Sequence, residues 1–214
     1  ARYAGKTFRI TTENLELYNE LEKGPDAFAM LSAHVGNYEM GGYTLVAKSK
    51  CIYMLVFGHE TQTVMENRQE QFGKTNIRMV PVGNGMNHLF AINEALTTGQ
   101  ILSMTADRRF GSEKAVPCNF FGAEALFPMG PFATVIQRDV PTLVVLVVKT
   151  GTRSYHAVVK RLPMPEAHLP RKERIALLAQ AYANELENVV RQYPEQWFNF
   201  FNIWTTTTCQ NPKQ

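Results

Sequence analysis

His34 and Glu39 are the two side chains whose types and spacing could perform acid–base chemistry. They lie in residues 29–42, where an apolar strand stops at His34 and a Gly36-Asn37 turn leads into a helix that carries Glu39. Five steps along one helix would leave the two side chains about 140° apart, whereas a strand-to-helix corner can bring them together. A carboxylate within hydrogen-bond reach of an imidazole fixes its tautomer and stabilises its protonated form. The corner therefore predicts a general base at His34 with Glu39 as its partner, and Asn37 is a candidate N-cap.

The same pair has a simpler explanation, because a histidine near a glutamate is more often structural or on the surface. The surrounding sequence favours a catalytic role for the pair, because an apolar strand precedes it, glycines lie around it and further polar segments follow downstream. On these two residues alone, both interpretations stay open.

Composition and charge narrow the class of protein. The chain has 214 residues, 45% of them hydrophobic and 19% charged, which indicates one globular domain. The formal net charge of +3 is too small an excess to favour nucleic acid, although it suits an anionic lipid surface or an acidic carrier protein. Cys51, Cys118 and Cys209 show neither paired nor metal-ligand spacing, so we expect free thiols and no metal site.

No segment of the sequence is expected to span a membrane. The most apolar run, residues 141–148, is too short to cross a bilayer and is typical of a buried strand. The chain begins with alanine, and only 33 residues precede His34. We therefore expect that a native N-terminal segment is missing from this sequence.

Short apolar runs alternate with amphipathic stretches along the chain, which favours an α/β fold in a single domain. The expected architecture is a central, mostly parallel mixed sheet flanked by helices. Strands are predicted at residues 7–10, 27–33, 51–57, 76–80, 100–106, 115–121, 125–127, 141–148 and 154–160. Helices are predicted at residues 12–22, 39–50, 60–72, 87–98, 129–138 and 171–192.

Polar residues follow three of the expected strands at the point where each strand ends. His34 follows the first core strand, His59 and Glu60 follow the second, and Asp107 follows the third. Since open α/β sheets bind ligands outside the carboxyl ends of their strands, we expect His34, Glu39 and Asp107 to share one crevice. Asp107 would orient a neighbouring arginine or help to fix His34, and the alternative is an aspartate that only caps a loop.

Arginine side chains offer candidate sites for anionic groups. Arg68, Arg108 and Arg109 could bind phosphate or pyrophosphate through their forked donors, or they could simply be solvated. Several other catalytic motifs are absent from the sequence. Without a G-x-S-x-G elbow or an H-E-x-x-H pattern, neither a serine acyl-enzyme nor a zinc hydrolase is expected.

Residues 32–39, with the sequence SAHVGNYE, resemble the H-x4-D/E block of the glycerolipid (lysophospholipid) acyltransferase superfamily. With Gly-Asn between the histidine and the glutamate, the block is similar to the late acyltransferases of lipid A biosynthesis. Five further blocks follow in the family's order, and the resemblance covers about residues 13 to 204. These blocks are residues 99–107, 120–122, 127–131, 140–144 and 193–197.

The resemblance implies one acyltransferase domain over residues 1–214, with a glycerol-3-phosphate acyltransferase-like fold. Such an enzyme moves a fatty acyl chain from an acyl thioester, on acyl carrier protein or coenzyme A, to a hydroxyl of a lipid A precursor. His34 would take the hydroxyl proton while Glu39 holds and polarises His34. The resemblance implies no metal and no cofactor beyond the acyl thioester as co-substrate.

The resemblance also implies roles for residues around the base. Arg68, in a segment like the family's R-x4-G, or a backbone N–H at the corner would bind the oxyanion. Asp107, Arg108 and Asn37 would bind the substrate or help to hold the oxyanion. A further set of apolar residues would line the acyl-chain groove, although each fits a plain core equally well. These are Phe120, Phe121, Phe127 and Met129.

Two departures from the family pattern affect these expectations. Arg108 stands where the family often has glutamine or histidine after the aspartate, which leaves the donor and acceptor preference open. The family also carries an N-terminal membrane helix that this chain does not show. We expect the protein at the cytoplasmic face of the inner membrane, with the aromatic residues 197–204 and nearby basic residues on the membrane surface.

Two alternatives to lipid A acylation remain. One is a lysophospholipid or aminolipid acyltransferase of the same superfamily, and the other is a lipid-binding protein that has lost turnover. The sequence leaves open the acceptor lipid, the acyl length, the donor carrier and the oligomeric state.

Overall fold

The structure is a computed structural model, and it describes residues 2–3, 6–37, 39–57, 76–83, 85–109 and 113–205. Strands of the central sheet are β3 (Arg9–Thr12), β4 (Phe28–Ser32), β5 (Ile52–Phe57), β6 (Ile77–Val82), β7 (Ile101–Thr105), β10 (Thr142–Gly151) and β11 (Ser154–Arg161). Helices are α1 (Leu15–Lys23), α2 (Glu39–Thr44), α4 (Asn87–Thr97), α5 (Met129–Arg138) and α6 (Arg171–Gln192), with a short 3-10 turn η1 (Pro194–Gln196). Two hairpins stand apart, β1 (Arg2–Tyr3) with β2 (Lys6–Thr7) and β8 (Ala115–Phe120) with β9 (Ala123–Pro128).

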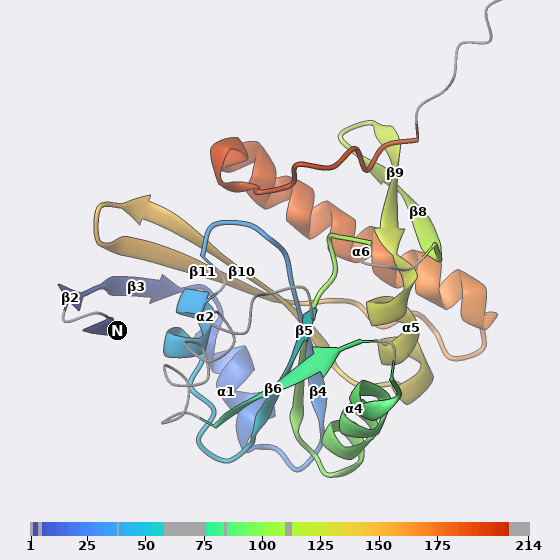
Figure 1. Cartoon of the computed structure of the whole chain (residues 1–214), viewed down its shortest axis with the longest axis horizontal. Coiled ribbons are helices and arrows are strands. Elements are labelled where there is room, and N and C mark those ends of the chain that lie inside the picture. Colours follow the sequence, from blue (N-terminus) through green and yellow to red (C-terminus); the bar gives the residue numbers. More distant parts are fainter. Residues whose placement is uncertain are drawn as a thin grey trace, which may run out of the picture.

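The central sheet has seven strands in the order β3-β11-β10-β4-β7-β5-β6. All neighbouring strands are parallel except β10 and β11, which form an antiparallel hairpin that reaches out to the left in Figure 1. This arrangement confirms the predicted α/β fold with a mostly parallel mixed sheet. The predicted helix at residues 60–72 lies outside the described residues.

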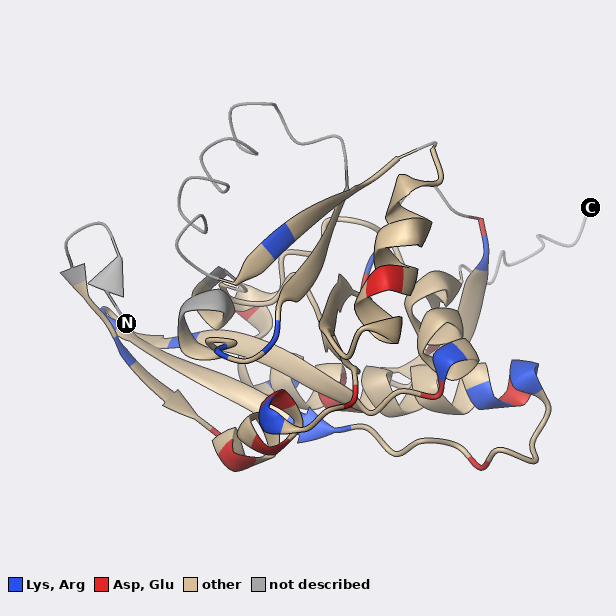
Figure 2. Ribbon diagram, turned by 90° about the horizontal axis from the view of Figure 1, so that it is seen from below, with Lys and Arg blue, Asp and Glu red and all other residues tan. Residues whose placement is uncertain are grey.

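Side chains alternate between the two faces of the sheet, as the two-residue period of a strand requires. Along β4, Phe28 and Met30 pack with Tyr18 of α1 on one face. Ala29 and Leu31 join the larger core on the other face, where α4, α5 and α6 lie. Figure 1 shows α1 and α2 apart from α4 and α5, and in Figure 2 the sheet strands are mostly free of charged residues. Both faces of β4 are therefore covered, which explains its continuous apolar run.

Helix α2 ends earlier than expected. The predicted helix ran from residue 39 to 50, but α2 stops at Thr44. Beyond it, the buried Glu22 carboxylate accepts hydrogen bonds from the backbone N–H of Lys48 at 2.6 Å and of Ser49 at 2.5 Å. Since these two N–H groups bond to a side chain, they cannot continue the helical hydrogen-bond ladder.

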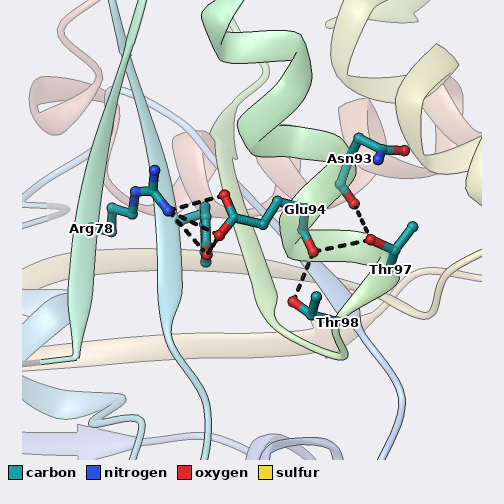
Figure 3. A network of polar contacts seen from close by, with 6 residues as sticks. Arg78, Asn93, Glu94, Thr97 and Thr98 are labelled. Carbon is teal, nitrogen blue, oxygen red and sulfur yellow. Dashed lines mark hydrogen bonds and ion pairs between the residues drawn. The ribbon is translucent and has the colours of Figure 1, made fainter.

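The outer edge of the sheet is fastened by a polar network around Glu94 (Figure 3). Arg78 on β6 donates to both Glu94 carboxylate oxygens, at 3.0 and 3.2 Å, and to the Tyr53 hydroxyl at 3.2 Å. Thr97 and Thr98 donate to backbone carbonyls of the helix that carries Glu94. The network joins β5, β6 and α4, so we assign it a structural role.

Among the residues that the structure describes, none of the helices is both long enough and apolar enough to cross a membrane.

Candidate active site

His34 and Asp107 meet because the adjacent parallel strands β4 and β7 run in register. Ser32 lies opposite Thr105 at the carboxyl ends of the two strands, and Ala106 N–H donates to the Ser32 carbonyl at 2.9 Å. His34 lies two residues after Ser32, and Asp107 lies two residues after Thr105. Two further steps along paired chains keep side chains level and on the same side. The register thus brings a histidine and an aspartate together from positions 73 residues apart.

The Asp107 carboxylate holds His34 at two points. One oxygen lies 2.8 Å from the ring Nδ1, and the other accepts the backbone N–H of His34 at 2.9 Å. The Asp107 side chain is fully buried, whereas 24% of the His34 side chain is exposed. Because an ionised carboxylate only accepts hydrogen bonds, Nδ1 must carry the proton and Nε2 the lone pair. The contact therefore selects the tautomer that a general base needs.

Tyr182 of α6 closes the buried side of this corner. Its hydroxyl donates to the Ser32 carbonyl at 2.8 Å, and the whole residue is buried. Burial, with a smaller contribution from the negative charge of Asp107, raises the pKa of the Tyr182 hydroxyl well above its ordinary value. Tyr182 is therefore neutral at every pH at which the protein would act, and it serves as a fixed hydrogen-bond donor.

Gly36 lets the chain turn at the corner. Its φ is +59°, and a Cβ placed there would lie 2.0 Å from the Val147 carbonyl oxygen. The Gly36 N–H donates to the Gln196 carbonyl at 2.8 Å, and the Asn37 N–H donates to the Val147 carbonyl at 2.9 Å. The Asn37 side chain accepts a long hydrogen bond, 3.4 Å, from Met40 N–H in the first turn of α2. Both corner N–H groups are thus engaged by backbone carbonyls.

Residues 193–204, here called the C-terminal strap, run along the corner and hold it in place. Val35 pairs with Trp197 in an antiparallel bridge, and the Phe198 N–H donates to the His34 carbonyl at 2.8 Å. The Gln196 side chain accepts from the backbone N–H of Lys149 and donates to its carbonyl, each at 2.8 Å. The strap therefore ties the His34 corner to β10, a role that its aromatic composition did not predict.

Arg108 connects the Asp107 loop to the same strap. Its Nη2 donates to the Phe198 carbonyl, and its guanidinium lies 5.6 Å from the centre of the Phe201 ring. Its Nε is buried and has no hydrogen-bond partner among the described residues. Arg109 is exposed. Arg108 thus stands beside the candidate base and is held by the strap.

The residues predicted to line an acyl groove lie on and around the β8–β9 hairpin. Phe120 and Phe127 are fully buried, with the strap's Trp197 and Trp204 close to the Phe120 ring. The half-buried Phe121 has a positive φ of 55° and carries the Arg191 guanidinium over its ring. Met129, at the start of α5, is half-buried against the core. The rings of Phe120 and Phe127 are thus surrounded by other protein side chains. The acyl-chain groove stays a prediction.

Two predicted residues cannot be placed by their side chains. Arg68 lies outside the described residues. Glu39 is the first residue of α2, but its side chain is outside the described part, so its role stays a prediction. Within the described part of the chain, no three histidine, cysteine, aspartate or glutamate side chains gather closely enough to bind a metal ion.

A histidine with a fixed tautomer at the carboxyl edge of an α/β sheet has the geometry that general-base catalysis requires. Comparison with known families narrows this class. Residues 6–206 match the profile of the family described as bacterial lipid A biosynthesis acyltransferase. Because the match spans most of the 214 residues, the chain belongs to this family and is an acyltransferase, as the sequence blocks predicted.

A solved structure supports the fold independently. The 1-acyl-sn-glycerophosphate (LPA) acyltransferase PlsC from Thermotoga maritima superposes with a TM-score of 0.51 and 11% sequence identity. The match covers 90% of this chain and 75% of that chain. At such low identity the similarity concerns the fold alone, and it agrees with the expected acyltransferase architecture. No curated protein sequence matches the chain.

Proposed function

We propose that the protein transfers a fatty acyl chain from an acyl thioester to a hydroxyl of a lipid A precursor. The donor is carried by acyl carrier protein or coenzyme A. Family membership supports the reaction class, and the observation that carries the mechanism is the contact between His34 and the buried Asp107 carboxylate. That contact leaves the Nε2 lone pair to accept a proton.

In this mechanism His34 Nε2 takes the proton of the acceptor hydroxyl as its oxygen attacks the thioester carbonyl. The tetrahedral intermediate then collapses, the carbon–sulfur bond breaks, and the imidazolium returns the proton to the departing thiolate. Asp107 stabilises the imidazolium between these two steps and keeps the ring in place. The products are an acyl ester and a free thiol, and no covalent enzyme intermediate is required.

The developing oxyanion needs hydrogen-bond donors. The two corner N–H groups, of Gly36 and Asn37, already donate to backbone carbonyls, which makes them poor candidates. We therefore keep Arg68 as the proposed donor. Asp107 takes the orienting role in this proposal because it contacts Nδ1, and the role predicted for Glu39 is tested separately.

We also propose that the protein works at the cytoplasmic face of the inner membrane. The strap presents three exposed aromatic side chains, namely Phe198, Phe200 and Phe201. Arg109 is exposed on the loop that follows Asp107. Aromatic rings and cationic groups together favour the interface of a bilayer with anionic head groups.

A transfer assay on the full-length protein tests the reaction. Radiolabelled acyl-carrier protein and acyl-coenzyme A are offered in turn, with a lipid A precursor and a lysophospholipid as acceptors. Wild type should acylate the lipid A precursor, and His34→Ala should abolish transfer while folding is kept. His168→Ala is the matched control, because His168 is exposed and, among the described residues, pairs only with the exposed Glu166.

The remaining outcomes separate the alternatives. Transfer only to the lysophospholipid would keep the mechanism and overturn the lipid A assignment. Lipid binding without transfer from either donor would favour a binding protein that has lost turnover. Comparing Glu39→Gln with Asp107→Asn in the same assay decides which carboxylate orients the base, since only the orienting one should match the loss in His34→Ala.

A further inference from the structure

A groove of about 610 Å³ opens beside the His34 corner. Its lining residues come from the turn of the β10–β11 hairpin, from the strap and from the corner itself. Among its lining residues are Asn37, Lys149, Thr152, Tyr155, Glu195 and Phe198. The Phe198 N–H donates to the backbone carbonyl of His34, so the groove adjoins the backbone of the corner that carries the candidate base, although the His34 ring is not among its lining residues.

The groove offers charged groups of both signs that have no partner in the part of the chain that the structure describes. Lys149 and Glu195 both line it, yet neither side chain forms an ion pair or hydrogen bond among the described residues. Only the backbone of Lys149 is engaged, and it binds the Gln196 side chain. The Thr152 hydroxyl at the hairpin turn likewise has no hydrogen-bond partner within the described ranges. The groove therefore holds a cationic donor, an anionic acceptor and a hydroxyl that remain available to a ligand.

The chemistry of these walls fits a sugar ring better than an anion or an acyl chain. A phosphate site would need an excess of positive charge, but Lys149 is balanced here by Glu195. An acyl chain would not satisfy the two charged groups. A pyranose combines apolar C–H faces, which pack on aromatic rings such as Tyr155 and Phe198, with hydroxyls that both donate and accept. The groove volume of about 610 Å³ lies in the range of small-ligand sites.

We propose that this groove binds a hexopyranose ring of the acceptor's head group and presents the acceptor hydroxyl to His34. The assignment of the sugar to the acceptor rests on the proposed function, because lipid A precursors are glycolipids. Lys149 donates to ring hydroxyls, Glu195 accepts from them, and Tyr155 and Phe198 pack on the ring. The groove then sets the specificity for a glycolipid acceptor.

Two variants test the groove, each with a matched control elsewhere on the surface. Lys149→Ala and Glu195→Ala remove the two charged groups while the backbone contact between Lys149 and Gln196 is retained. The controls are Lys172→Ala on α6 and Glu16→Ala on α1, both exposed. Acyl transfer by the full-length protein gives KM for the lipid A precursor and, separately, for the acyl thioester donor. Saturation-transfer NMR with a deacylated glucosamine disaccharide measures sugar binding without turnover.

Each groove variant should raise KM for the glycolipid about tenfold. The loss of one hydrogen bond to a charged group lowers binding affinity by at least that factor. KM for the donor and both controls should stay at wild-type values, and saturation transfer should fall in the groove variants only. A raised donor KM in place of the acceptor KM, or unchanged acceptor KM and saturation transfer, would overturn the proposal. If wild type acylates no glycolipid but its sugar signal still depends on Lys149 and Glu195, the proposed function fails while the sugar site stands.

Discussion

Replacing Asp107 by asparagine tests the mechanism most directly. Asparagine keeps the size of the side chain but offers one oxygen and one NH2 group where aspartate offers two acceptors. The backbone N–H of His34 can only donate, so it keeps the asparagine oxygen. The NH2 group then faces Nδ1, which must become the acceptor. The proton therefore moves to Nε2, and the ring loses the lone pair that the reaction needs.

The expected loss follows from this change of tautomer. In enzymes where a carboxylate orients a catalytic histidine, forcing the wrong tautomer lowers kcat by about 10⁴-fold. That factor corresponds to about 5.5 kcal/mol of transition-state stabilisation. Asp107→Asn should also destabilise the fold by about 1–3 kcal/mol, because a buried charge-assisted hydrogen bond is lost. The activity loss thus greatly exceeds what partial unfolding of a stable protein would cause.

The assay compares kcat for acyl transfer in wild type, Asp107→Asn and Asp26→Asn, alongside denaturant unfolding of all three. Asp26 is exposed and offers a matched exchange away from the corner. A folded Asp107→Asn protein that retains more than about a tenth of the wild-type kcat would refute the tautomer argument. The base would then be oriented by another group.

Three further predictions concern the stability and packing of the fold. Gly36→Ala should destabilise the protein by more than about 1 kcal/mol in denaturant unfolding, because its Cβ would clash with the Val147 carbonyl at a positive φ. Burial raises the pKa of the Glu22 carboxyl, but backbone hydrogen bonds led by Ser49 outweigh it and lower the pKa overall. The stability that Glu22 contributes is therefore full above its unfolded pKa and lost as pH falls through the folded pKa, so Glu22→Gln should flatten the acid limb of stability against pH. Burial raises the pKa of the Cys118 thiol to about 12, so it should react with a thiol reagent only on unfolding, and Cys118→Ser should leave native-state labelling unchanged.

Local hydrophobic patterns in the sequence predicted most of the secondary structure. The run at residues 143–148 is apolar at every position because β10 is buried on both faces, and a continuous apolar run is typical of such a strand. The long amphipathic repeat at residues 171–192 became α6 with the expected bounds. The sequence did not predict the end of α2 at Thr44. The backbone N–H groups of Lys48 and Ser49, which follow the helix, donate to the Glu22 carboxylate, and no local pattern records a contact between such distant residues.

The sequence by itself determined the family, the α/β class and the position of His34 at a strand end, because motif spacing and hydrophobic period are local properties. The tertiary structure decided that Asp107 contacts the ring of His34, since that depends on the pairing register of β4 and β7. It also decided that Gln196 and Lys149 lie beside the corner, where the strap returns from the end of α6. Strand order and register place residues that are far apart in the chain side by side, and these relations are fixed only when the whole core packs.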